Sequence, residues 1–399
     1  MAIWLKACER HGPDIRLDLR LADSAGEACE PRPNRLAKSP GVHRIHHITT
    51  GYPSSGRPRQ GLRERVLGHA TVMDMNTKIF VATARGLGCW DLSGADAEPS
   101  RALADKAVTS VVAREGVVLA GTHDGVYRSD DGGKTFVATG DGLSASHVRW
   151  LAYDPDVSDR EFAGTEPAGI FVSRDGARTW QRRPEVEALR DRFGWFLPYS
   201  PESGCVRGFA FHGRRAYAAV EVGGVLRSDD SGEIWRLAGG STGEPVFEIP
   251  PAPRVHADVH SVLAHPSSPD LVFAVTAEGL YRSGDGGDTW TVSHGGSYCR
   301  AAWVDPEDED HVILGPADSV SRKNGRIEET VDGGRNWQLA SDGLDLPWPD
   351  TMVERFFQLA GDLVAVTNTG RAYVSPLSPI RWTRILREVD GISAVAVMS

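Results

Sequence analysis

The sequence predicts an all-β protein, a seven-bladed β-propeller of four-stranded antiparallel blades that is closed by its C-terminal strand. Two observations lead to this fold class. A turn of eight residues recurs five times, about 45 to 55 residues apart, and repeats of that length are typical of solenoids and propellers. Around each copy, short β-branched and small apolar runs alternate with Gly and Asp turns, which is the pattern of β-hairpins.

The repeated turn has the pattern Ser/Thr-x-Asp-x-Gly-x-Thr-Trp/Phe. Its copies are SDDGGKTF from Ser129, SRDGARTW from Ser173, SDDSGEIW from Ser228, SGDGGDTW from Ser283 and TVDGGRNW from Thr330. Ala177 replaces the glycine in the second copy, and Ile234 and Asn336 replace the threonine in the third and fifth. We therefore expect those three copies to be weaker turns.

Each copy follows a predicted hairpin, such as VVLAGTHDGVYRSDD or LVFAVTAEGLYRSGD. Segments 80–92 and 363–377 have the hairpin without the turn, and VILGPADSVSRKNGRIEETVD has a hairpin with a longer turn. An apolar strand precedes each hairpin except the first, and an aromatic-led strand follows those with the turn. Four strands per repeat in seven repeats indicate seven blades.

The missing strand of the first repeat is supplied by ISAVAV at 392–397, the last apolar segment of the chain. Pairing of this strand with the first hairpin would close the ring. The segment ATVMDM at 70–75 is an alternative extra strand for the first blade.

Residues 1–74 differ in composition from residues 75–399, which we assign to the propeller. The first segment holds 12 Lys and Arg against 8 Asp and Glu, contains PRP and GRPR, and lacks a strand or helix period. We expect it to be a disordered or non-native extension.

The repeated turn resembles the Asp-box, or BNR repeat, of the sialidase-like β-propeller superfamily, although no single characterised member matches closely. The resemblance covers 78–399 and implies a structural role for the five aspartates. These are Asp131, Asp175, Asp230, Asp285 and Asp332. Each carboxylate is expected to accept hydrogen bonds from its own turn, on the face away from the usual ligand site.

Composition excludes several classes of function. A net charge of −10 gives no basic surface for nucleic acid, and no apolar run is long enough to cross a membrane. The first residues lack a secretory signal, and the five cysteines form no metal or disulfide pattern. We expect a cytoplasmic protein without cofactor or metal. His256 and His260 are near neighbours, but their spacing outside a helix is uninformative.

The ligand site of a propeller is expected where the first strands begin. The second residue of each first strand is Thr109, Arg149, Arg207, His260, Arg300, Arg355 or Ser393. Arginine forks recognise carboxylate and phosphate groups. The sequence thus predicts that Arg149, Arg207, His260, Arg300 and Arg355 bind an anion, although pairing with local acids is the alternative.

Hairpin turns and two long insertions add further candidates. Glu166 and Glu221 would lie beside Arg207 as acid–base catalysts, or would only neutralise arginines. Insertions at 184–204 and 239–259 carry aromatic residues, of which Trp195 and Tyr199 are candidate ligand contacts. Loops of this length in a compact domain are often binding loops.

Two function classes follow from these residues. The first is an anion or sugar-acid pocket, with glycosidase-like or lyase-like catalysis left undecided. The chain lacks the arginine-isoleucine-proline motif of sialidases, which makes that activity doubtful. The second is a non-catalytic scaffold or assembly-factor propeller that binds a protein partner. The sequence gives neither the substrate nor the oligomeric state.

Overall fold

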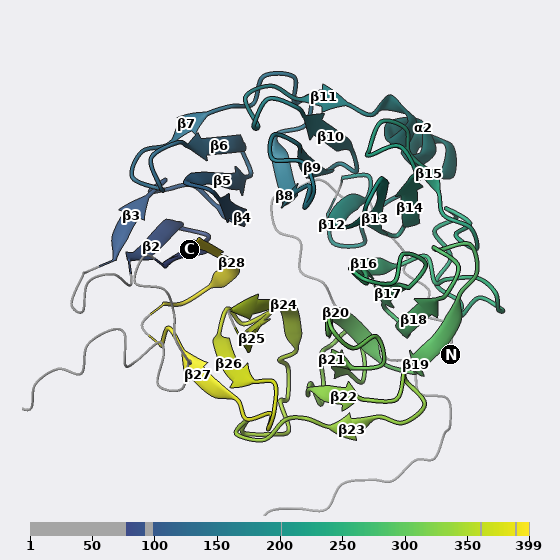
Figure 1. Cartoon of the computed structure of the whole chain (residues 1–399). Coiled ribbons are helices and arrows are strands. Elements are labelled where there is room, and N and C mark those ends of the chain that lie inside the picture. The colour runs from purple at the N-terminus through teal and green to yellow at the C-terminus, as the bar shows by residue number, and fades with distance from the viewer. Residues whose placement is uncertain (1–76, 92–98, 201, 360, 388, 399) are drawn as a thin grey trace, which may run out of the picture. The chain divides into compact units, whose positions relative to one another are not determined.

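The computed structural model describes residues 77–91, 99–200, 202–359, 361–387 and 389–398, which form a ring of antiparallel sheets (Figure 1). The predicted extension at 1–74 and the alternative strand at 70–75 lie outside these residues. Seven sheets of four strands each surround a common axis, so the predicted fold class is confirmed.

The first four blades follow the chain from the first hairpin. Blade 1 contains β1 (Lys78–Thr83), β2 (Gly86–Asp91), β3 (Ser100–Ala102) and β28 (Ile392–Met398). Blade 2 contains β4 (Val108–Arg114), β5 (Val117–Thr122), β6 (Gly125–Ser129) and β7 (Val137–Ala138). Blade 3 contains β8 (His147–Tyr153), β9 (Glu161–Glu166), β10 (Ile170–Ser173) and β11 (Gln181–Arg182). Blade 4 contains β12 (Cys205–His212), β13 (Arg215–Glu221), β14 (Gly224–Ser228) and β15 (Arg236–Leu237).

The remaining three blades complete the ring. Blade 5 contains β16 (Val259–Ala264), β17 (Val272–Thr276), β18 (Gly279–Ser283) and β19 (Thr291–Gly295). Blade 6 contains β20 (Tyr298–Val304), β21 (Val312–Ala317), β22 (Glu328–Thr330) and β23 (Gln338–Leu339). Blade 7 contains β24 (Val353–Leu359), β25 (Asp362–Thr367), β26 (Ala372–Pro376) and β27 (Thr383–Ile385).

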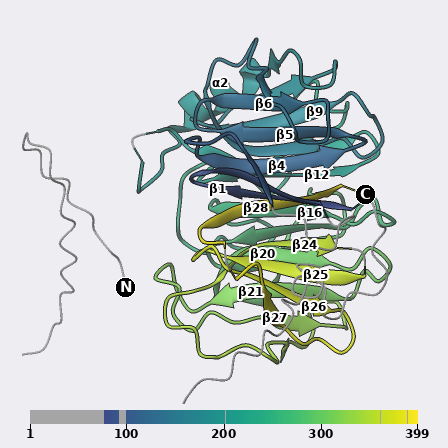
Figure 2. The same cartoon turned by 90° about the vertical axis from the view of Figure 1, so that its left-hand side faces the viewer.

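The C-terminal strand β28 is the innermost strand of blade 1, as the sequence predicts. It pairs antiparallel with β1, from Lys78 opposite Met398 to Thr83 opposite Ile392. Figure 2 shows β28 and β1 side by side between the early and late blades. The ring is therefore closed within a single sheet.

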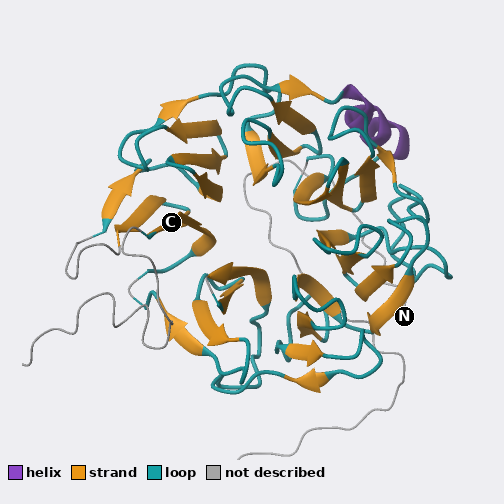
Figure 3. Ribbon diagram, in the orientation of Figure 1, coloured by secondary structure: helices purple, strands orange, loops and turns teal. Residues whose placement is uncertain are grey.

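Burial follows the position of each strand in its blade. The second strands β9 and β17 are buried at every residue, because both faces of each sheet pack against neighbouring blades. The outermost strands are short and mostly exposed, as in β7, β11 and β23 (Figure 3). Short edge strands limit pairing with other chains.

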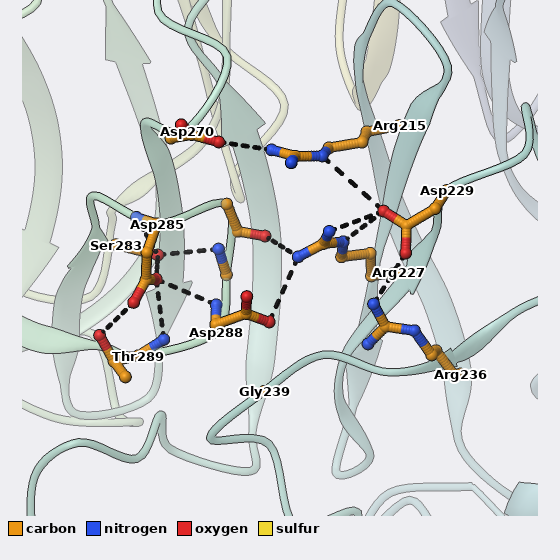
Figure 4. Close-up of polar contacts among 12 residues, drawn as sticks. Arg215, Arg227, Asp229, Arg236, Gly239, Asp270, Ser283, Asp285, Asp288 and Thr289 are labelled. Carbon is orange, nitrogen blue, oxygen red and sulfur yellow. Dashed lines mark hydrogen bonds and ion pairs between the residues drawn. The ribbon is translucent and has the colours of Figure 1, made fainter.

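The five Asp-boxes join the third and fourth strands of blades 2 to 6. In blade 5, Asp285 accepts hydrogen bonds from the backbone N–H of Asp288 and Thr289 and from the Thr289 hydroxyl, and Figure 4 shows this turn. Ser283 donates to the same carboxylate, at 2.8 Å. The boxes lie at the lower face, which we define as the end of each blade where the innermost strand ends. The structural role expected of these aspartates agrees with this geometry.

The substituted copies differ in their hydrogen bonds. Asn336 replaces threonine but donates its side-chain N–H to Asp332 at 2.7 Å, so the expectation of a weaker turn is wrong at this position. Ile234 offers no such donor to Asp230. Ala177 holds a positive φ of 62°, where glycine is normally preferred.

Tryptophans at the start of the outer strands join adjacent blades. The indole N–H of Trp180, Trp290 and Trp337 donates to a backbone carbonyl of the preceding blade, on Thr139, Gly239 and Ser293 respectively. In blade 7, which has no Asp-box, the indole N–H of Trp382 donates to the carbonyl of Ala340 in blade 6.

An arginine before the Asp-box adds a second link between blades. Arg227 of blade 4 pairs with Asp229 at 2.7 Å and donates to the Gly286 carbonyl of the blade 5 box at 2.8 Å (Figure 4). Arg128 of blade 2 makes the equivalent contact with Gly176.

The only helix among the described residues is α2 (Pro184–Phe193), which lies in the insertion before blade 4 (Figure 3). The sequence analysis treats this insertion as a loop. Within the described part of the chain, no helix is long and apolar enough to span a membrane.

Candidate functional site

Each of the seven innermost strands contains a β-bulge near its first residue, at the upper face of the propeller. A bulge leaves one residue outside the ladder and re-aims its side chain. The bulged residues are Thr109, Arg149, Arg207, His260, Arg300, Glu354 and Ser393, with Ala301 next to Arg300 in the same irregularity. These seven residues, which differ in type, occupy equivalent positions in the seven blades, and we call them the ring.

Three of the bulged residues tie neighbouring blades together. The hydroxyl of Ser393 donates to Val108 O at 2.6 Å, and the hydroxyl of Thr109 donates to Val148 O at 2.5 Å. Nδ1 of His260 lies 2.6 Å from Cys299 O, which only a donor can approach so closely. Each bond joins one innermost strand to the next.

Three charged residues of the ring, Arg207, Arg300 and Glu354, form ion pairs with one another. Arg207 donates to Glu354 at 2.6 Å and to Glu221 at 3.0 Å, and Arg300 contacts both oxygens of Glu354 at 2.8 and 2.9 Å. Burial alone would raise the pKa of Glu354, but Arg300 and Arg207 lower it to about 2. The carboxylate is therefore ionised and shared by two guanidinium groups.

Arg355 is the residue predicted at the ring position of blade 7, and this prediction is wrong by one residue. The ladder shifts between Val353 and Arg355, so Glu354 is the bulged residue. In the other innermost strands, a Val, Cys or Ile precedes the bulged residue. Val353 precedes Glu354 in the same way, so alignment on this apolar residue finds the correct register.

Arg355 nevertheless reaches the same region. Its guanidinium lies 3.9 Å from the centre of the Trp150 ring and donates to Thr109 O at 3.1 Å. Burial lowers the pKa of Arg355 to about 9, and the charges of Arg207 and Arg149 contribute while Glu354 opposes. Within the described residues, Arg355 has no carboxylate in ion-pair contact.

A cavity of about 480 Å³ opens among these residues. Its charged lining consists of Arg149, Arg207, Arg300, Arg322, Arg355 and Glu354. The turn from Thr367 to Gly370 and the ring residues Thr109 and Ser393 supply polar neutral groups. Four predicted arginines are thus brought together.

Arg322 is a lining residue that the sequence analysis misses. It lies in the long turn between β21 and β22, where φ is 62° and the backbone N–H donates to Ser319 O. No ion pair involves Arg322 among the described residues. The only sequence signal was the unusual length and basic composition of this turn.

The two predicted catalytic acids lie outside the cavity lining and contact arginines. Glu166 is 3.0 Å from Arg149 and accepts a hydrogen bond from Ser200 at 2.7 Å. Glu221 contacts Arg207 and accepts a hydrogen bond from Tyr199 at 2.8 Å. Glu221 thus lies beside Arg207 as expected, whereas Glu166 pairs with Arg149.

Two other predicted contacts are not part of the cavity. His260 belongs to the ring but is 2% exposed and does not line the cavity, and Trp195 is 2% exposed within the core, where its N–H donates to Gly243 O. The expectation that Trp195 contacts a ligand therefore disagrees with its burial. The large apolar indole of Trp195 is more stable in contact with core residues than in water.

Part of the predicted aromatic surface is exposed. Phe196 and Phe247, from the two insertions, lie with ring centres 6.0 Å apart, and Tyr199 is 55% exposed. Val246 and Ile249 are also exposed next to Phe247 in the chain. We refer to Phe196, Tyr199, Val246, Phe247 and Ile249 as the insertion patch.

Solved structures with the same fold are distantly related in sequence. The GH74 xyloglucanase of Xanthomonas campestris matches 71% of this chain and 45% of its own length, at 20% identity and a TM-score of 0.52. YCF48 of Cyanidioschyzon merolae matches 74% of this chain and 90% of its own length, at 16% identity and a TM-score of 0.53. A structure of YCF48 bound to D1 peptide matches 74% and 87%, at 14% identity and a TM-score of 0.51.

The chain is a seven-bladed propeller distantly similar in structure to GH74 xyloglucanases and Ycf48-type propellers. It spans less than half the length of the GH74 enzymes, with 37%, 45% and 46% of three of them covered. No family model matches the sequence, and neither does any curated protein. At these identities the similarity establishes the fold alone.

Proposed function

We propose that the arginine-lined cavity at the upper face binds a small anionic molecule that carries a carboxylate or phosphate group. The observation that carries this proposal is that Arg322 and Arg355 both line the cavity without an ion-paired carboxylate among the described residues. Both side chains are partly buried, and a partly buried cation without a carboxylate partner is unfavourable, so a bound anion would supply that partner.

The charge balance of the cavity supports an anion. Five arginines line it, and the carboxylates in contact with them are Glu166, Glu221 and Glu354, so two positive charges remain. The pKa of Arg355 is lowered towards 9, but a guanidinium stays protonated at neutral pH. These two charges would hold a divalent anion or one carboxylate by paired hydrogen bonds.

The shape and polarity of the cavity favour a ligand of sugar-acid size. Its volume of about 480 Å³ lies within the range of small-molecule sites. Thr367, Asn368 and Thr369 bring hydroxyl and amide groups to the rim, which suit the hydroxyls of a sugar. Trp150 adds an apolar face beneath Arg355.

Binding is favoured over catalysis by the placement of the acids. Glu166 and Glu221 are ion-paired and lie outside the lining, so neither is free to transfer a proton. If the protein is a glycosidase-like or lyase-like enzyme, Glu166→Gln or Glu221→Gln should abolish turnover and retain binding. If both variants kept full activity, the two carboxylates would have no catalytic role and would only neutralise arginines.

The binding proposal is tested by calorimetric titration of the full chain with glucuronate, benzoate and inorganic phosphate. We expect at least one to bind, and Arg355→Gln or Arg322→Gln to weaken it by about tenfold or more, the effect of losing one charge-assisted hydrogen bond. Arg182→Gln is the control, because Arg182 pairs with Glu187 on the outer helix region away from the cavity.

The stability of Arg355→Gln provides a second measurement. The variant removes an unpaired, partly buried charge but also the hydrogen bond to Thr109 O and the contact with the Trp150 ring, so its melting temperature should stay close to that of the wild type while binding falls. Absence of binding by every member of the panel, or equal binding by wild type and Arg355→Gln, would reject the proposal.

The insertion patch supports a second candidate function, a scaffold that binds a protein partner. Its five apolar side chains are exposed and come from two insertions. Exposed apolar clusters of this kind often mark interaction sites. Phe196→Asp together with Phe247→Asp should abolish association with a partner and leave anion binding intact, and unchanged association would exclude the patch.

A further inference from the structure

A second polar cluster lies between blades 4 and 5 and includes one of the bulged residues. It consists of Glu221 at the end of β13, Asp258 immediately before β16 and the bulged residue His260. Each offers one ligand atom, and the three atoms lie within 4.8 Å of one another. None of the three lines the arginine-lined cavity. All three are buried, with exposed fractions of 3%, 9% and 2%.

The protonation of His260 follows from its contacts. Nδ1 lies 2.6 Å from Cys299 O, so this nitrogen carries a proton and donates it to the carbonyl. Nε2 then has a lone pair in the neutral ring, which is the form that binds metal ions. A backbone carbonyl on the far nitrogen is the usual support of a metal-binding histidine.

Asp258 faces this lone pair and lacks a hydrogen-bond donor. Its Oδ1 is buried without a hydrogen-bond partner and lies 3.3 Å from His260 Nε2. Tyr298 OH is also 3.3 Å from Nε2 and accepts hydrogen bonds from Arg300. A carboxylate oxygen opposite a filled nitrogen orbital is repelled, so a cation between them would stabilise the arrangement.

Glu221 completes the set with a second carboxylate. All its described hydrogen bonds end on Oε2, from Tyr199, Cys205 and Arg207. The Cys205 thiol lies 3.3 Å from Oε2 and donates to it. The carboxylate is thus oriented from one side by three donors.

The local charge also favours a cation. Glu221 and Asp258 bring two carboxylates to the cluster, and among the described residues the one guanidinium in ion-pair contact with either of them is Arg207, which contacts Glu221. A metal ion with bonds of about 2.1 Å holds its tetrahedral ligand atoms about 3.4 Å apart. The Asp258–His260 separation already matches this value.

We propose that Glu221, Asp258 and His260 form a binding site for a divalent first-row metal ion such as Zn²⁺ or Mn²⁺. One imidazole nitrogen and two carboxylates suit these ions, and three protein ligands leave a position for water or a ligand. His256, the other histidine considered from the sequence, is excluded. Its Nδ1 accepts from Asp258 N, and its Nε2 contacts Phe247 O.

The test is calorimetric titration of metal-free full chain with Zn²⁺ and with Mn²⁺ at pH 7.5. We expect one ion per chain at the site, and Asp258→Asn or His260→Gln to weaken binding by at least about tenfold. Co²⁺ gives a second readout, because the visible absorption band of a low-coordinate Co²⁺ ion should appear in the wild type and be lost in His260→Gln. This band does not report on stability.

Asp305→Asn is the matched control. Asp305 lies 3.0 Å from one ring nitrogen of His311, and Glu329 lies 3.6 Å from the other. The two carboxylates therefore cannot bind one metal ion together with a single nitrogen of His311. This variant should bind metal as the wild type does. The proposal is overturned if the wild type binds neither ion, or if Asp258→Asn and His260→Gln bind as tightly as the wild type. Neither result bears on anion binding in the arginine-lined cavity.

Discussion

Arg207 of blade 4 donates a hydrogen bond of 2.6 Å to Glu354 of blade 7. Three steps is the largest separation possible between blades in a ring of seven, so this ion pair reaches across the channel. Arg355 of blade 7 donates a hydrogen bond to Thr109 O of blade 2, and its guanidinium lies over the Trp150 ring of blade 3. The upper channel is therefore held by polar contacts between distant blades.

Replacement of Glu354 with Gln should destabilise the protein by about 3–5 kcal/mol, because Arg207 and Arg300 would keep buried charges without their shared partner. Chemical denaturation at pH 7 measures this loss. The control is Glu307→Gln, an exposed acid, for which a change within about 0.5 kcal/mol is expected. Equal stability of both variants would show that the crossing pair contributes nothing.

The same carboxylate should govern part of the acid sensitivity. The pKa of Glu354 is lowered from 4.5 to about 2 in the folded chain, so its contribution is complete above pH 4.5 and is lost as the pH falls towards 2. Melting temperatures between pH 6 and 2 should fall less steeply for Glu354→Gln than for the wild type. Parallel curves would contradict the assignment.

Glu161 of blade 3 should destabilise the protein at alkaline pH. It is 1% exposed, its Oε2 has no hydrogen-bond partner, and burial raises its pKa from 4.5 to about 7. Below pH 4.5 the acid is neutral in both states, whereas above pH 7 the cost reaches about 3 kcal/mol. Glu161→Gln should therefore melt higher than the wild type at pH 8, and this advantage should vanish near pH 4.

Ile234→Thr should stabilise the Asp-box of blade 4 by about 1 kcal/mol, because a hydroxyl at this position can donate to Asp230 as Thr289 donates to Asp285. Ile234 is 66% exposed, so little apolar burial is lost. The reciprocal variant Thr289→Val should lose a similar amount. Both effects are measured by denaturant unfolding, and a destabilised Ile234→Thr would exclude the hydrogen-bond explanation.

Deletion of residues 391–399 should abolish cooperative unfolding. It removes β28, which pairs with β1 and buries Ile392 and Ala394 against the adjacent blades. The exposed edge of β1 would also favour aggregation. Calorimetry of the truncated chain tests this, and melting at the wild-type temperature would show that ring closure is dispensable.

The sequence by itself determined the fold, the blade count, the closing strand and the role of the five Asp-boxes. These features depend on local physics. Two-residue alternation forms strands, and Ser129, Asp131 and Thr135 complete a turn within eight residues. Because the same turn and hairpin pattern recurs in successive blades, the number of blades could be predicted from the sequence.

Tertiary structure decided the composition of the site. Glu354 occupies the ring position because a bulge shifts the β24–β25 ladder, and bulges depend on strand pairing. Arg322 reaches the cavity from a long turn, and Trp195 lies in the core instead of contacting a ligand. Asp258 and His260, two residues apart in the chain, meet Glu221 only because blades 4 and 5 pack together. Such contacts join residues far apart in sequence, and their side-chain directions follow from packing between blades.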